Sequence, residues 1–332
     1  MTWVSSTAGS GAEVSQVVIT GGCGFIGSHL AERLALSGHE VTIFDAGSLP
    51  NDFTASVRHI RGDVRDEAGL AAAITDNTEV IYHLSATVGV DRYLAIPADV
   101  VEVNMMGTLH VLRRARAVQA KFVLASTSEV YGNNPDTPWR EDADRVLGST
   151  AVARWSYSTS KALAEHLTFA YIRQHGLCAA IVRYFNVYGP RQRPAYVISR
   201  SIHRALGGLA PEVYDAGAQT RCFTYVQDAV EGTVLVGTSP KANGECFNIG
   251  SSHETTVAEV VSIVCDLTKL PVPAVFLDTA ARFGPSYQDI VRRVPDTRKA
   301  HDMLGWECAT SLREGLAQTI RWARNNPWWQ KQ

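Results

Sequence analysis

A glycine-rich turn near the N-terminus restricts the fold more than any other feature of the sequence. In "VVITGGCGFIGSHL", Gly21, Gly24 and Gly27 follow a short apolar run and open a stretch with helical spacing. Glycines so placed form a tight turn, let the backbone approach a pyrophosphate, and let helix and strand pack closely. Because the strand and the helix are both present, the motif predicts a dinucleotide-binding unit. The alternative interpretation is a plain strand-to-helix turn.

Short apolar runs alternate with helical stretches as far as residue 189. The runs are "VVIT", "EVTIFD", "VRHIRGD", "EVIYHLSA" and "KFVLASTS". This alternation predicts an α/β fold with a Rossmann-type, doubly wound parallel sheet. From Pro190 onward the chain is richer in Gly, Pro and aromatic residues, which predicts a smaller C-terminal α/β lobe that binds the substrate. We expect a disordered leader (1–14), an NAD-binding domain (15–189, with return segments around 222–252) and a substrate-binding lobe (190–221 and 253–328).

Charge and cysteine content exclude several functional classes. The chain has 31 basic and 33 acidic residues without a block of like charge, so nothing favours a nucleic-acid or anionic membrane partner. No apolar run approaches the roughly 20 residues that a membrane span needs. The six cysteines are scattered without a C-x-x-C pair, which is typical of reduced core residues. We therefore expect a cytoplasmic protein without a bound metal.

Two carboxylates follow the next predicted strands. Asp45 ends the second strand, where it can accept hydrogen bonds from both ribose hydroxyls of NAD and would repel a 2′-phosphate. The sequence therefore favours NAD over NADP. Asp63, which precedes Val64 in "GDV", can bond the adenine amino group. The alternative role for Asp63 is to cap the helix that follows.

The stretch "YSTSK" predicts a proton-transfer site. Tyr157 and Lys161 are four residues apart, so they share one face of a helix. A nearby ammonium is expected to lower the tyrosine pKa from its usual value of about 10, and Lys161 can also hold the nicotinamide ribose. A hydroxyl at a strand end, Thr127 in "STSEVYG", can bond the same substrate oxygen. These residues together predict oxidation of an alcohol while NAD takes the hydride; alone, the pair could be an exposed helix face.

Taken together, the motifs resemble the extended short-chain dehydrogenase/reductase family of nucleotide-sugar epimerases, dehydratases and decarboxylases. They are "TGGCGFIGSHL", "HLSA", "STSEVYG", "YSTSK", "RYFNVYGPRQRP", "QTRCFTYVQDAV" and "NIGS". The resemblance covers the chain from Gln16 to about Arg324. It implies a tightly held NAD, a nucleoside-diphosphate sugar, oxidation at the sugar C4, and a homodimer built on helices of each subunit.

The resemblance also implies a role for individual residues. Tyr157 is the base, Lys161 its partner and Thr127 the third member. The other cofactor-lining positions are Phe25, Ile26, Leu84, Ser85, Ala86 and Tyr184, and the other substrate-binding positions are Ser128, Asn186 and Arg221. An arginine fork matches phosphate oxygens, which independently supports a diphosphate contact for Arg221. A surface salt bridge is the alternative for Arg221.

Two uronate chemistries fit the strand end best. Ser128 stands where dehydratases of the deoxysugar type carry Asp, which argues against that branch, although GDP-mannose dehydratases carry a Ser-Glu version. Uronate decarboxylases resemble "STSEVYG" and "RWSYSTSK". UDP-glucuronate 4-epimerases resemble "YGPRQRP", with Arg193 meeting the sugar carboxylate, but usually carry a small residue at the position of Glu129. Both readings share UDP-glucuronate as substrate.

The fate of the sugar carboxylate separates the two chemistries. A firm clamp by Arg193, helped by Arg191, would favour epimerisation, whereas Glu129 beside the carboxylate would favour loss of carbon dioxide. From the "PRQRP" loop we expect a UDP-glucuronate 4-epimerase that forms UDP-galacturonate through a 4-keto intermediate. UDP-glucuronate decarboxylase and UDP-glucose 4-epimerase are the alternatives. Glu129 is either catalytic or ties down a loop, and Arg282, Tyr287 or Arg292 is the candidate for a further diphosphate contact.

Overall fold

The computed structural model describes residues 15–332, except for 270–272, 279–289 and 291. The predicted leader, residues 1–14, lies outside the described residues. So do Arg282 and Tyr287, two of the three candidates for the further diphosphate contact.

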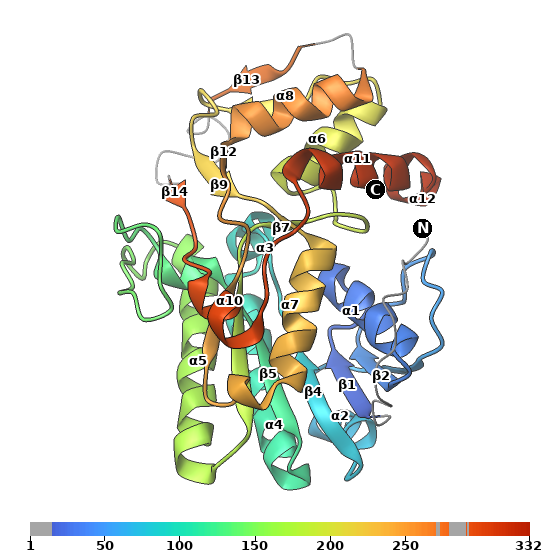
Figure 1. The fold of residues 1–332 in the computed structure, drawn as a ribbon, viewed down its shortest axis with the longest axis vertical. Helices are drawn as coiled ribbons and strands as arrows, with labels where there is room; N and C mark the ends of the chain where they lie inside the picture. The colour runs from blue at the N-terminus through green and yellow to red at the C-terminus, as the bar shows by residue number, and fades with distance from the viewer. Residues whose placement is uncertain (1–14, 270–272, 279–289, 291) are drawn as a thin grey trace.

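The central sheet has the predicted parallel arrangement (Figure 1). Within the described residues it contains seven strands, all paired in parallel. In order across the sheet they are β11 (Cys246–Ile249), β6 (Ala179–Tyr184), β5 (Lys121–Thr127), β4 (Thr78–His83), β1 (Gln16–Thr20), β2 (Glu40–Asp45) and β3 (Arg58–Arg61). The strand order reverses between β1 and β4, and open sheets of this kind bind ligands beside that point. The expected α/β Rossmann fold is confirmed.

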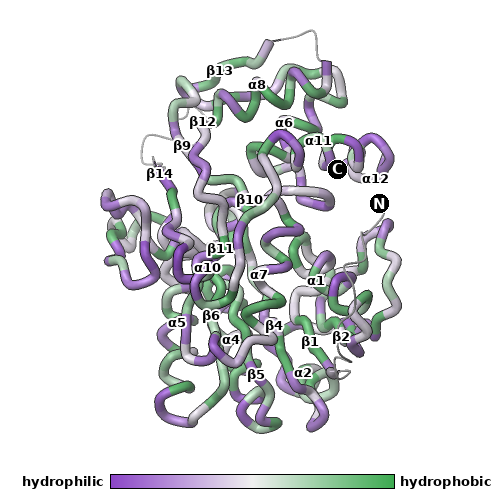
Figure 2. Tube along the Cα trace, viewed as in Figure 1, coloured by the Kyte–Doolittle hydropathy of each residue, from purple (hydrophilic) through white to green (hydrophobic). Residues whose placement is uncertain are grey.

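Helices cover both faces of the sheet and create two apolar cores. These helices, with one short 3-10 turn, are α1 (Phe25–Leu36), α2 (Glu67–Ala73), α3 (Val90–Ala95), α4 (Pro97–Val118), η1 (Ser128–Tyr131), α5 (Arg154–His175) and α7 (Val226–Thr238). On one face, Leu30 of α1 and Val230 of α7 join a core with Ile19. On the other, Leu112 of α4 and Ala164 of α5 join a second core. Figure 2 shows hydrophobic residues concentrated along the central strands, as expected for strands buried on both faces.

The start of α2 settles one alternative from the sequence. The N-cap of this helix is Asp66, whose Oδ1 accepts a hydrogen bond from the Ala68 amide at 3.0 Å. The alternative role for Asp63, as the cap of this helix, is therefore wrong. Asp63 lies one turn earlier and faces a cavity, as described below.

A smaller group of elements packs above the central sheet (Figure 1). Its members, with the connecting elements, are β7 (Val187–Tyr188), α6 (Val197–Leu206), β8 (Glu212–Tyr214), β9 (Thr220–Cys222), β10 (Thr224–Tyr225), β12 (Glu254–Thr256), α8 (Val257–Thr268), β13 (Val275–Leu277), β14 (Arg292–Arg293), α11 (Leu312–Arg324) and α12 (Pro327–Gln330). A small sheet in the order β12-β9-β14 lies among them. By contrast, α10 (Arg298–Leu304) packs beside the central sheet, against β11, α7 and η2 (Pro240–Ala242). The exact domain boundaries stay a prediction. No helix in the described part of the chain is long and apolar enough to cross a bilayer.

Candidate active site

The glycine turn requires glycine at two positions for steric reasons. Gly21 has φ +76°, and a Cβ atom on it would lie 2.5 Å from the Ser85 backbone nitrogen. A Cβ atom on Gly27 would lie 2.2 Å from the Gly21 carbonyl oxygen. Both distances are far below van der Waals contact. The turn therefore brings the start of α1 against β1 and β4, with Gly24 as the N-cap of the helix.

A cavity of about 430 Å³ opens beside this turn. The predicted cofactor residues that line it are Gly21, Gly24, Asp45, Asp63, Val64, Leu84, Ser85 and Ala86. Asp45 is held in place because its Oδ2 accepts a hydrogen bond from the Cys23 amide at 2.9 Å and its Oδ1 accepts one from Gly47 at 2.8 Å. Arg65 hydrogen-bonds Asp63 and holds the pKa of that carboxyl below its usual value. The fixed carboxylates and the close-packed glycines fit a dinucleotide with free ribose hydroxyls.

A second cavity, of about 440 Å³, contains the predicted catalytic residues. It shares Gly24, Leu84 and Ala86 with the first cavity, so the two adjoin. The other predicted residues that line it are Phe25, Ile26, Gly27, Thr127, Ser128, Glu129, Tyr157, Lys161, Tyr184, Asn186 and Arg193. The ends of β5 and β6 and the start of α5 thus bring residues from distant parts of the sequence to one place.

The environment of Tyr157 differs from the expectation. Burial and the nearby Glu129 carboxylate raise the tyrosine pKa well above its usual value, and a hydrogen bond with Thr127 acts in the opposite direction. Lys161 does not contribute the expected lowering of the Tyr157 pKa. Its Nζ instead donates a hydrogen bond to the Ala125 carbonyl at 2.8 Å. Thr127 is therefore the described neighbour that favours the phenolate.

Lys161 is almost fully buried, and the nearby Glu165 carboxylate stabilises its charge. Burial lowers the pKa of Lys161 to about 8, and the Glu165 carboxylate partly opposes that effect. Glu165 forms a two-point ion pair with Arg183 of β6, at 3.0 and 2.6 Å, and accepts a hydrogen bond from the Ser126 hydroxyl. This buried network ties α5, which carries Tyr157 and Lys161, to β5 and β6.

Glu129 has an arginine partner that the sequence did not single out. The Arg293 Nη1 lies 3.3 Å from the Glu129 Oε1, and the two side chains are 10% and 16% exposed. The Glu129 Oε2 is buried and has no hydrogen-bond partner among the described residues. Both side chains line the catalytic cavity. Arg293 enters through pairing of β14 with β9, where it stands opposite Arg221, and no local motif indicates that pairing.

The two arginines of the "PRQRP" loop have different surroundings. Arg193 lines the catalytic cavity, and its two terminal nitrogens contact both carboxylate oxygens of Asp91, at 2.8 and 2.9 Å. Arg191 is turned away and forms ion pairs with Glu32 and Asp52, at 2.9 and 3.0 Å, with a side chain that is only 6% exposed. The expectation that Arg191 helps to clamp a substrate is therefore wrong, because its guanidinium already binds two carboxylates.

Two remaining predicted phosphate contacts, Arg221 and Arg292, are not among the residues that line the catalytic cavity. Arg221 is buried on β9 and donates from Nη1 to the Thr220 carbonyl at 2.7 Å; it stands on the same face of the small sheet as Arg293. Arg292 faces the opposite side and forms an exposed ion pair with Glu254 at 2.7 and 2.8 Å. Arg292 is therefore engaged on the surface, away from the catalytic cavity.

Two further cavity residues have their polar groups directed into the protein. The Tyr184 hydroxyl hydrogen-bonds the Thr233 hydroxyl of α7 at 2.7 Å, so the tyrosine presents its ring to the cavity. Asn186 has φ +39° and donates from Nδ2 to the Cys222 carbonyl at 3.2 Å. Gln192 and Tyr196, which were not among the predicted site residues, also line the cavity.

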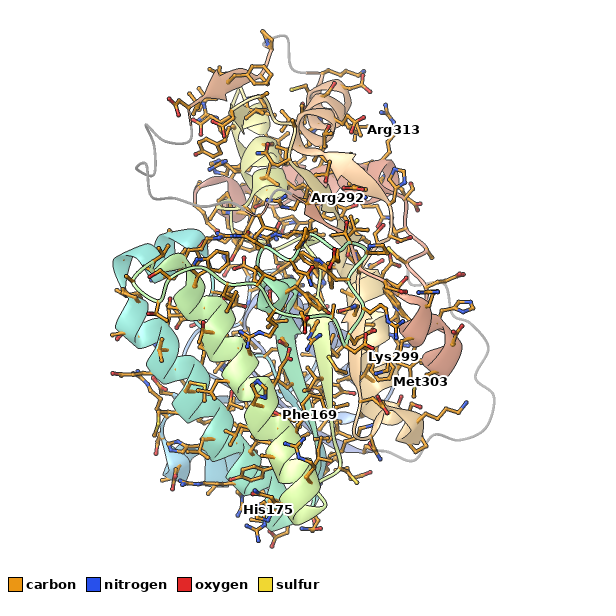
Figure 3. The ribbon with its side chains drawn as sticks, turned by 90° about the vertical axis from the view of Figure 1, so that its left-hand side faces the viewer. Phe169, His175, Arg292, Lys299, Met303 and Arg313 are labelled. Carbon is orange, nitrogen blue, oxygen red and sulfur yellow. The ribbon has the colours of Figure 1, made fainter. Side chains whose placement is uncertain are left out.

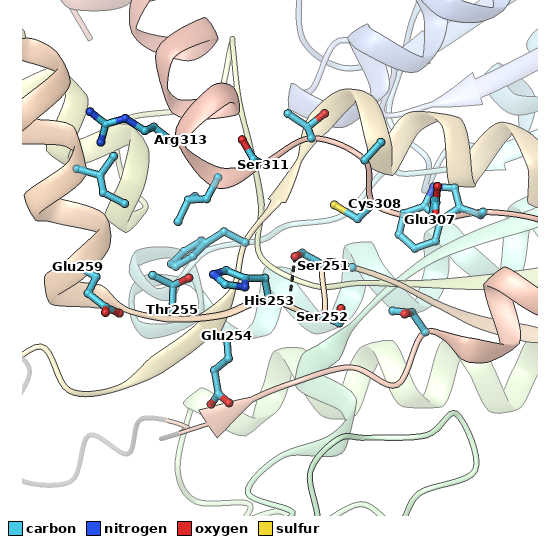
Figure 4. A pocket seen from close by; sticks show the side chains of 18 of the residues that line it. Ser251, Ser252, His253, Glu254, Thr255, Glu259, Glu307, Cys308, Ser311 and Arg313 are labelled. Carbon is cyan, nitrogen blue, oxygen red and sulfur yellow. Dashed lines mark hydrogen bonds between the residues drawn. The ribbon is translucent and has the colours of Figure 1, made fainter.

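A larger cavity, of about 1090 Å³, lies elsewhere (Figure 4). His253 and Thr255 approach it from the segment around β12, and Ser311 and Arg313 approach it from the start of α11. None of the residues that line it belongs to the glycine turn or lines the cavity that contains Tyr157.

Comparison with known proteins identifies relatives over nearly the whole chain. Residues 17–250 match the NAD dependent epimerase/dehydratase family. A UDP-N-acetyl-alpha-D-glucosaminuronate decarboxylase of Bacillus cytotoxicus is 39% identical over 315 residues, which cover 92% of this chain and 97% of that protein. UDP-glucuronic acid decarboxylase 1 of Danio rerio is 35% identical over 315 residues, which cover 92% of this chain and 72% of that protein.

The solved structure of MoeE5 in complex with UDP-glucuronic acid and NAD is also similar. It is 34% identical, with a TM-score of 0.82, and the match covers 94% of this chain and 100% of that one. These findings confirm the expected NAD cofactor and the expected resemblance to nucleotide-sugar enzymes. They do not confirm the 4-epimerase, and they support the decarboxylase alternative better.

Proposed function

Because the chain belongs to the NAD dependent epimerase/dehydratase family, we propose that it is an NAD-dependent decarboxylase of UDP-glucuronate. The observation that carries this proposal is the Glu129–Arg293 pair, which lies in the same cavity as Tyr157 and Thr127. The similar proteins of Bacillus cytotoxicus and Danio rerio are uronate decarboxylases, which agrees with it. The epimerase that we expected from the "PRQRP" loop becomes the second candidate.

The first step is oxidation of the sugar at C4. In its phenolate form, which the hydrogen bond from Thr127 favours, Tyr157 would accept the proton of the C4 hydroxyl. The chemistry that NAD supplies when bound is reversible hydride exchange at C4. The glycine turn and Asp45 would hold its pyrophosphate and adenosine ribose, and Lys161 is suited to the nicotinamide ribose.

The ketone at C4 activates the neighbouring carboxylate. The C6 carboxylate is then β to a carbonyl, so the electron pair of the C5–C6 bond can pass into a C4–C5 enolate as carbon dioxide leaves. A proton is then added at C5. If hydride returns to C4, the product is UDP-xylose; if it does not, the product is a 4-keto-pentose.

Glu129 and Arg293 suit this second step. The buried, unpartnered Oε2 of Glu129 would place a negative charge near the substrate carboxylate, and that repulsion is relieved when carbon dioxide leaves. Arg293 supplies a cation in the same cavity, where the negative charge of the enolate develops. Glu129 and Arg293 carry opposite charges, but both would act at the carboxylate end of the sugar.

The 4-epimerase remains the second candidate because of Arg193, which lines the cavity and could hold the C6 carboxylate against cleavage. Its guanidinium already contacts both oxygens of Asp91, so a substrate carboxylate would have to compete for it. UDP-glucose 4-epimerase activity is a third possibility, which requires no contact to a carboxylate.

Product mass distinguishes these candidates. The purified protein is incubated separately with UDP-glucuronate, UDP-N-acetylglucosaminuronate and UDP-glucose, and the products are analysed by mass spectrometry. We expect UDP-glucuronate to lose the mass of one carbon dioxide. A galacto product of unchanged mass would contradict the decarboxylase and support the epimerase, and turnover of UDP-glucose alone would remove both uronate assignments.

We further propose that the protein is a homodimer that associates through α4 and α5. These helices pack side by side along one outer face (Figure 3). Both helices carry exposed apolar side chains: Val101 of α4 is 40% exposed, Met106 of α4 42% and Leu163 of α5 50%. Exposed apolar side chains gathered on one face commonly mark a protein interface. A cytoplasmic location likewise stays part of the proposal.

A further inference from the structure

Gln192 has a buried amide oxygen without a partner. Its side chain lies in the loop between β7 and α6 and is 6% exposed. The Nε2 donates a hydrogen bond to the Val187 carbonyl at 2.8 Å, whereas the Oε1 has no hydrogen-bond partner among the described residues. A buried acceptor without a donor is destabilising, so a donor that satisfies this oxygen would be favourable.

The orientation of this amide is determined by its neighbour. The Val187 carbonyl can only accept a hydrogen bond, so the NH₂ group of Gln192 must face it. A flipped amide would place two oxygen atoms against each other. The end that lacks a partner is therefore an acceptor, and it requires a donor such as a hydroxyl group.

Gln192 lies within the catalytic cavity, together with Glu129, Tyr157 and Arg293. In the proposed mechanism, three of these residues are already assigned to polar groups of the sugar. Tyr157 is assigned to the C4 hydroxyl, and Arg293 and Glu129 act at the carboxylate end. The donors on the ring that have no assigned acceptor are the hydroxyls at C2 and C3.

The loop that carries Gln192 is held from several sides. The Gln192 carbonyl accepts a hydrogen bond from the Trp329 Nε1 at 2.8 Å. The preceding Arg191 is paired with Glu32 and Asp52, and the Arg193 carbonyl accepts a bond from the Ser199 hydroxyl at 2.7 Å. An acceptor on such a loop is oriented before substrate arrives, which is what selective recognition requires.

We propose that Gln192 is a specificity-determining residue whose Oε1 accepts a hydrogen bond from the C2 or C3 hydroxyl of the hexuronate ring. The proposal rests on a UDP-hexuronate being the substrate, but it does not depend on whether the product is decarboxylated or epimerised. Both chemistries need the same ring placed for oxidation at C4. Loss of the contact therefore affects the hydride-transfer step.

The test combines a variant with altered substrates. Gln192→Met preserves the length of the side chain and removes the acceptor. Transient reduction of bound NAD is followed by stopped-flow absorbance for the wild-type protein and the variant, with UDP-glucuronate and its 2-deoxy and 3-deoxy analogues. We expect wild type to lose about 10- to 100-fold in kcat/KM with one deoxy analogue, because Oε1 is then left unpaired. Gln192→Met should lose a similar factor with UDP-glucuronate and nothing further with that same analogue.

If the effects of the Gln192→Met substitution and of the hydroxyl deletion do not add, Gln192 recognises that hydroxyl and does not act only on the structure. A purely structural defect would lower kcat/KM for all three sugars by the same factor. Gln174→Met, which changes an exposed glutamine near the far end of α5, is the matched control and should behave as wild type. Because NAD reduction precedes any loss of carbon dioxide, failure of the decarboxylase assignment would leave this readout intact.

The proposal stays falsifiable even if Gln192→Met does not fold. The wild-type protein alone can then be compared on the three sugars. Equal kcat/KM for UDP-glucuronate and both deoxy analogues would overturn the proposal. So would fully additive effects of the variant and of each deoxygenation.

Discussion

Arg293 and Glu129 form a nearly buried ion pair, with 3.3 Å between Nη1 and Oε1, although one residue closes β14 and the other follows β5. The pair joins the small upper sheet to the strand end that carries Thr127. Removing two charges from water costs free energy unless hydrogen bonds and ion pairs satisfy both groups. Here one carboxylate oxygen of Glu129 has no partner among the described residues. The arrangement suits a site completed by a charged substrate.

Glu129→Gln should separate oxidation from decarboxylation. The amide keeps the shape of the side chain but removes the negative charge, so we expect carbon dioxide release to fall by about 100-fold or more while NAD reduction persists. Release is measured as labelled carbon dioxide and reduction by absorbance. Arg292→Gln is the control, because the neighbouring Arg292 pairs with Glu254 on the other face of the small sheet. Equal loss of both steps would contradict a specific role for Glu129 after oxidation.

Tyr157→Phe should abolish the proton transfer that accompanies oxidation. We expect turnover to fall by about 10³-fold, with little change in thermal unfolding, because the ring and its packing with Tyr93 are retained. NAD reduction by stopped-flow absorbance is the direct measurement. Tyr171→Phe, on the same helix, serves as control and should retain wild-type turnover. A Tyr157→Phe protein with near-normal NAD reduction would remove Tyr157 as the base.

Asp45→Asn should weaken cofactor discrimination. The amide loses the charge that accepts both ribose hydroxyls and repels a 2′-phosphate, so affinity for NAD should fall roughly 10- to 100-fold. Affinity for NADP should fall less or rise. Titration of the cofactor-free protein with each dinucleotide gives both constants. An unchanged ratio of the two would refute the assignment of Asp45 to the ribose.

His83 should make the fold sensitive to acid. It is fully buried between the hydroxyls of Thr20 and Thr108, and burial, assisted by the Lys161 charge, lowers its pKa to about 3. The unfolded chain binds a proton near pH 6.5, so the stability that neutral His83 provides is present above that pH and is lost as pH falls toward 3. Between pH 7 and pH 5 the loss is about 2 kcal/mol from this group.

His83→Gln removes that titration. Urea unfolding at pH 7 and pH 5 should show a smaller difference in the free energy of unfolding for the variant than for wild type. His301→Gln, which changes an exposed histidine, is the control and should match wild type. Equal pH dependence in all three proteins would show that His83 is not responsible.

Charges on the apolar face of α4 and α5 should separate the proposed dimer. We expect Val101→Glu combined with Leu163→Glu to give a monomer by light scattering after size-exclusion chromatography, because two carboxylates per subunit would be buried. Leu209→Glu changes an equally exposed leucine on another part of the surface and should leave the mass unchanged. A wild-type protein that elutes as a monomer at all concentrations would contradict the dimer itself.

Local features of the chain made much of the site predictable. The glycine turn, Asp45 and the Tyr157–Lys161 pair each depend on spacing within a single strand–helix unit, and all of them line the two adjoining cavities. The parallel sheet followed in the same way from alternating apolar runs. Such features need no knowledge of how distant segments meet.

The errors arose where tertiary contacts decide the outcome. Arg191 and Arg193 are nearly adjacent and chemically equal, yet a φ of +69° at Arg191 accompanies its turn toward Glu32 and Asp52. The pKa of Tyr157 depends on burial and on Glu129, which a helix pattern does not reveal. Arg293 reaches Glu129 only through a short pairing with β9, and two-residue strands carry no periodic signal.

The loop around Gln192 also has a consequence for the order in which the protein is assembled. Its anchors come from both ends of the chain: Glu32 and Asp52 from the first sixth, and Trp329 from the last few residues. During synthesis on the ribosome, the glycine turn and its sheet can form long before Trp329 emerges. The cofactor platform can therefore form before the loop at the sugar pocket has all of its anchoring contacts.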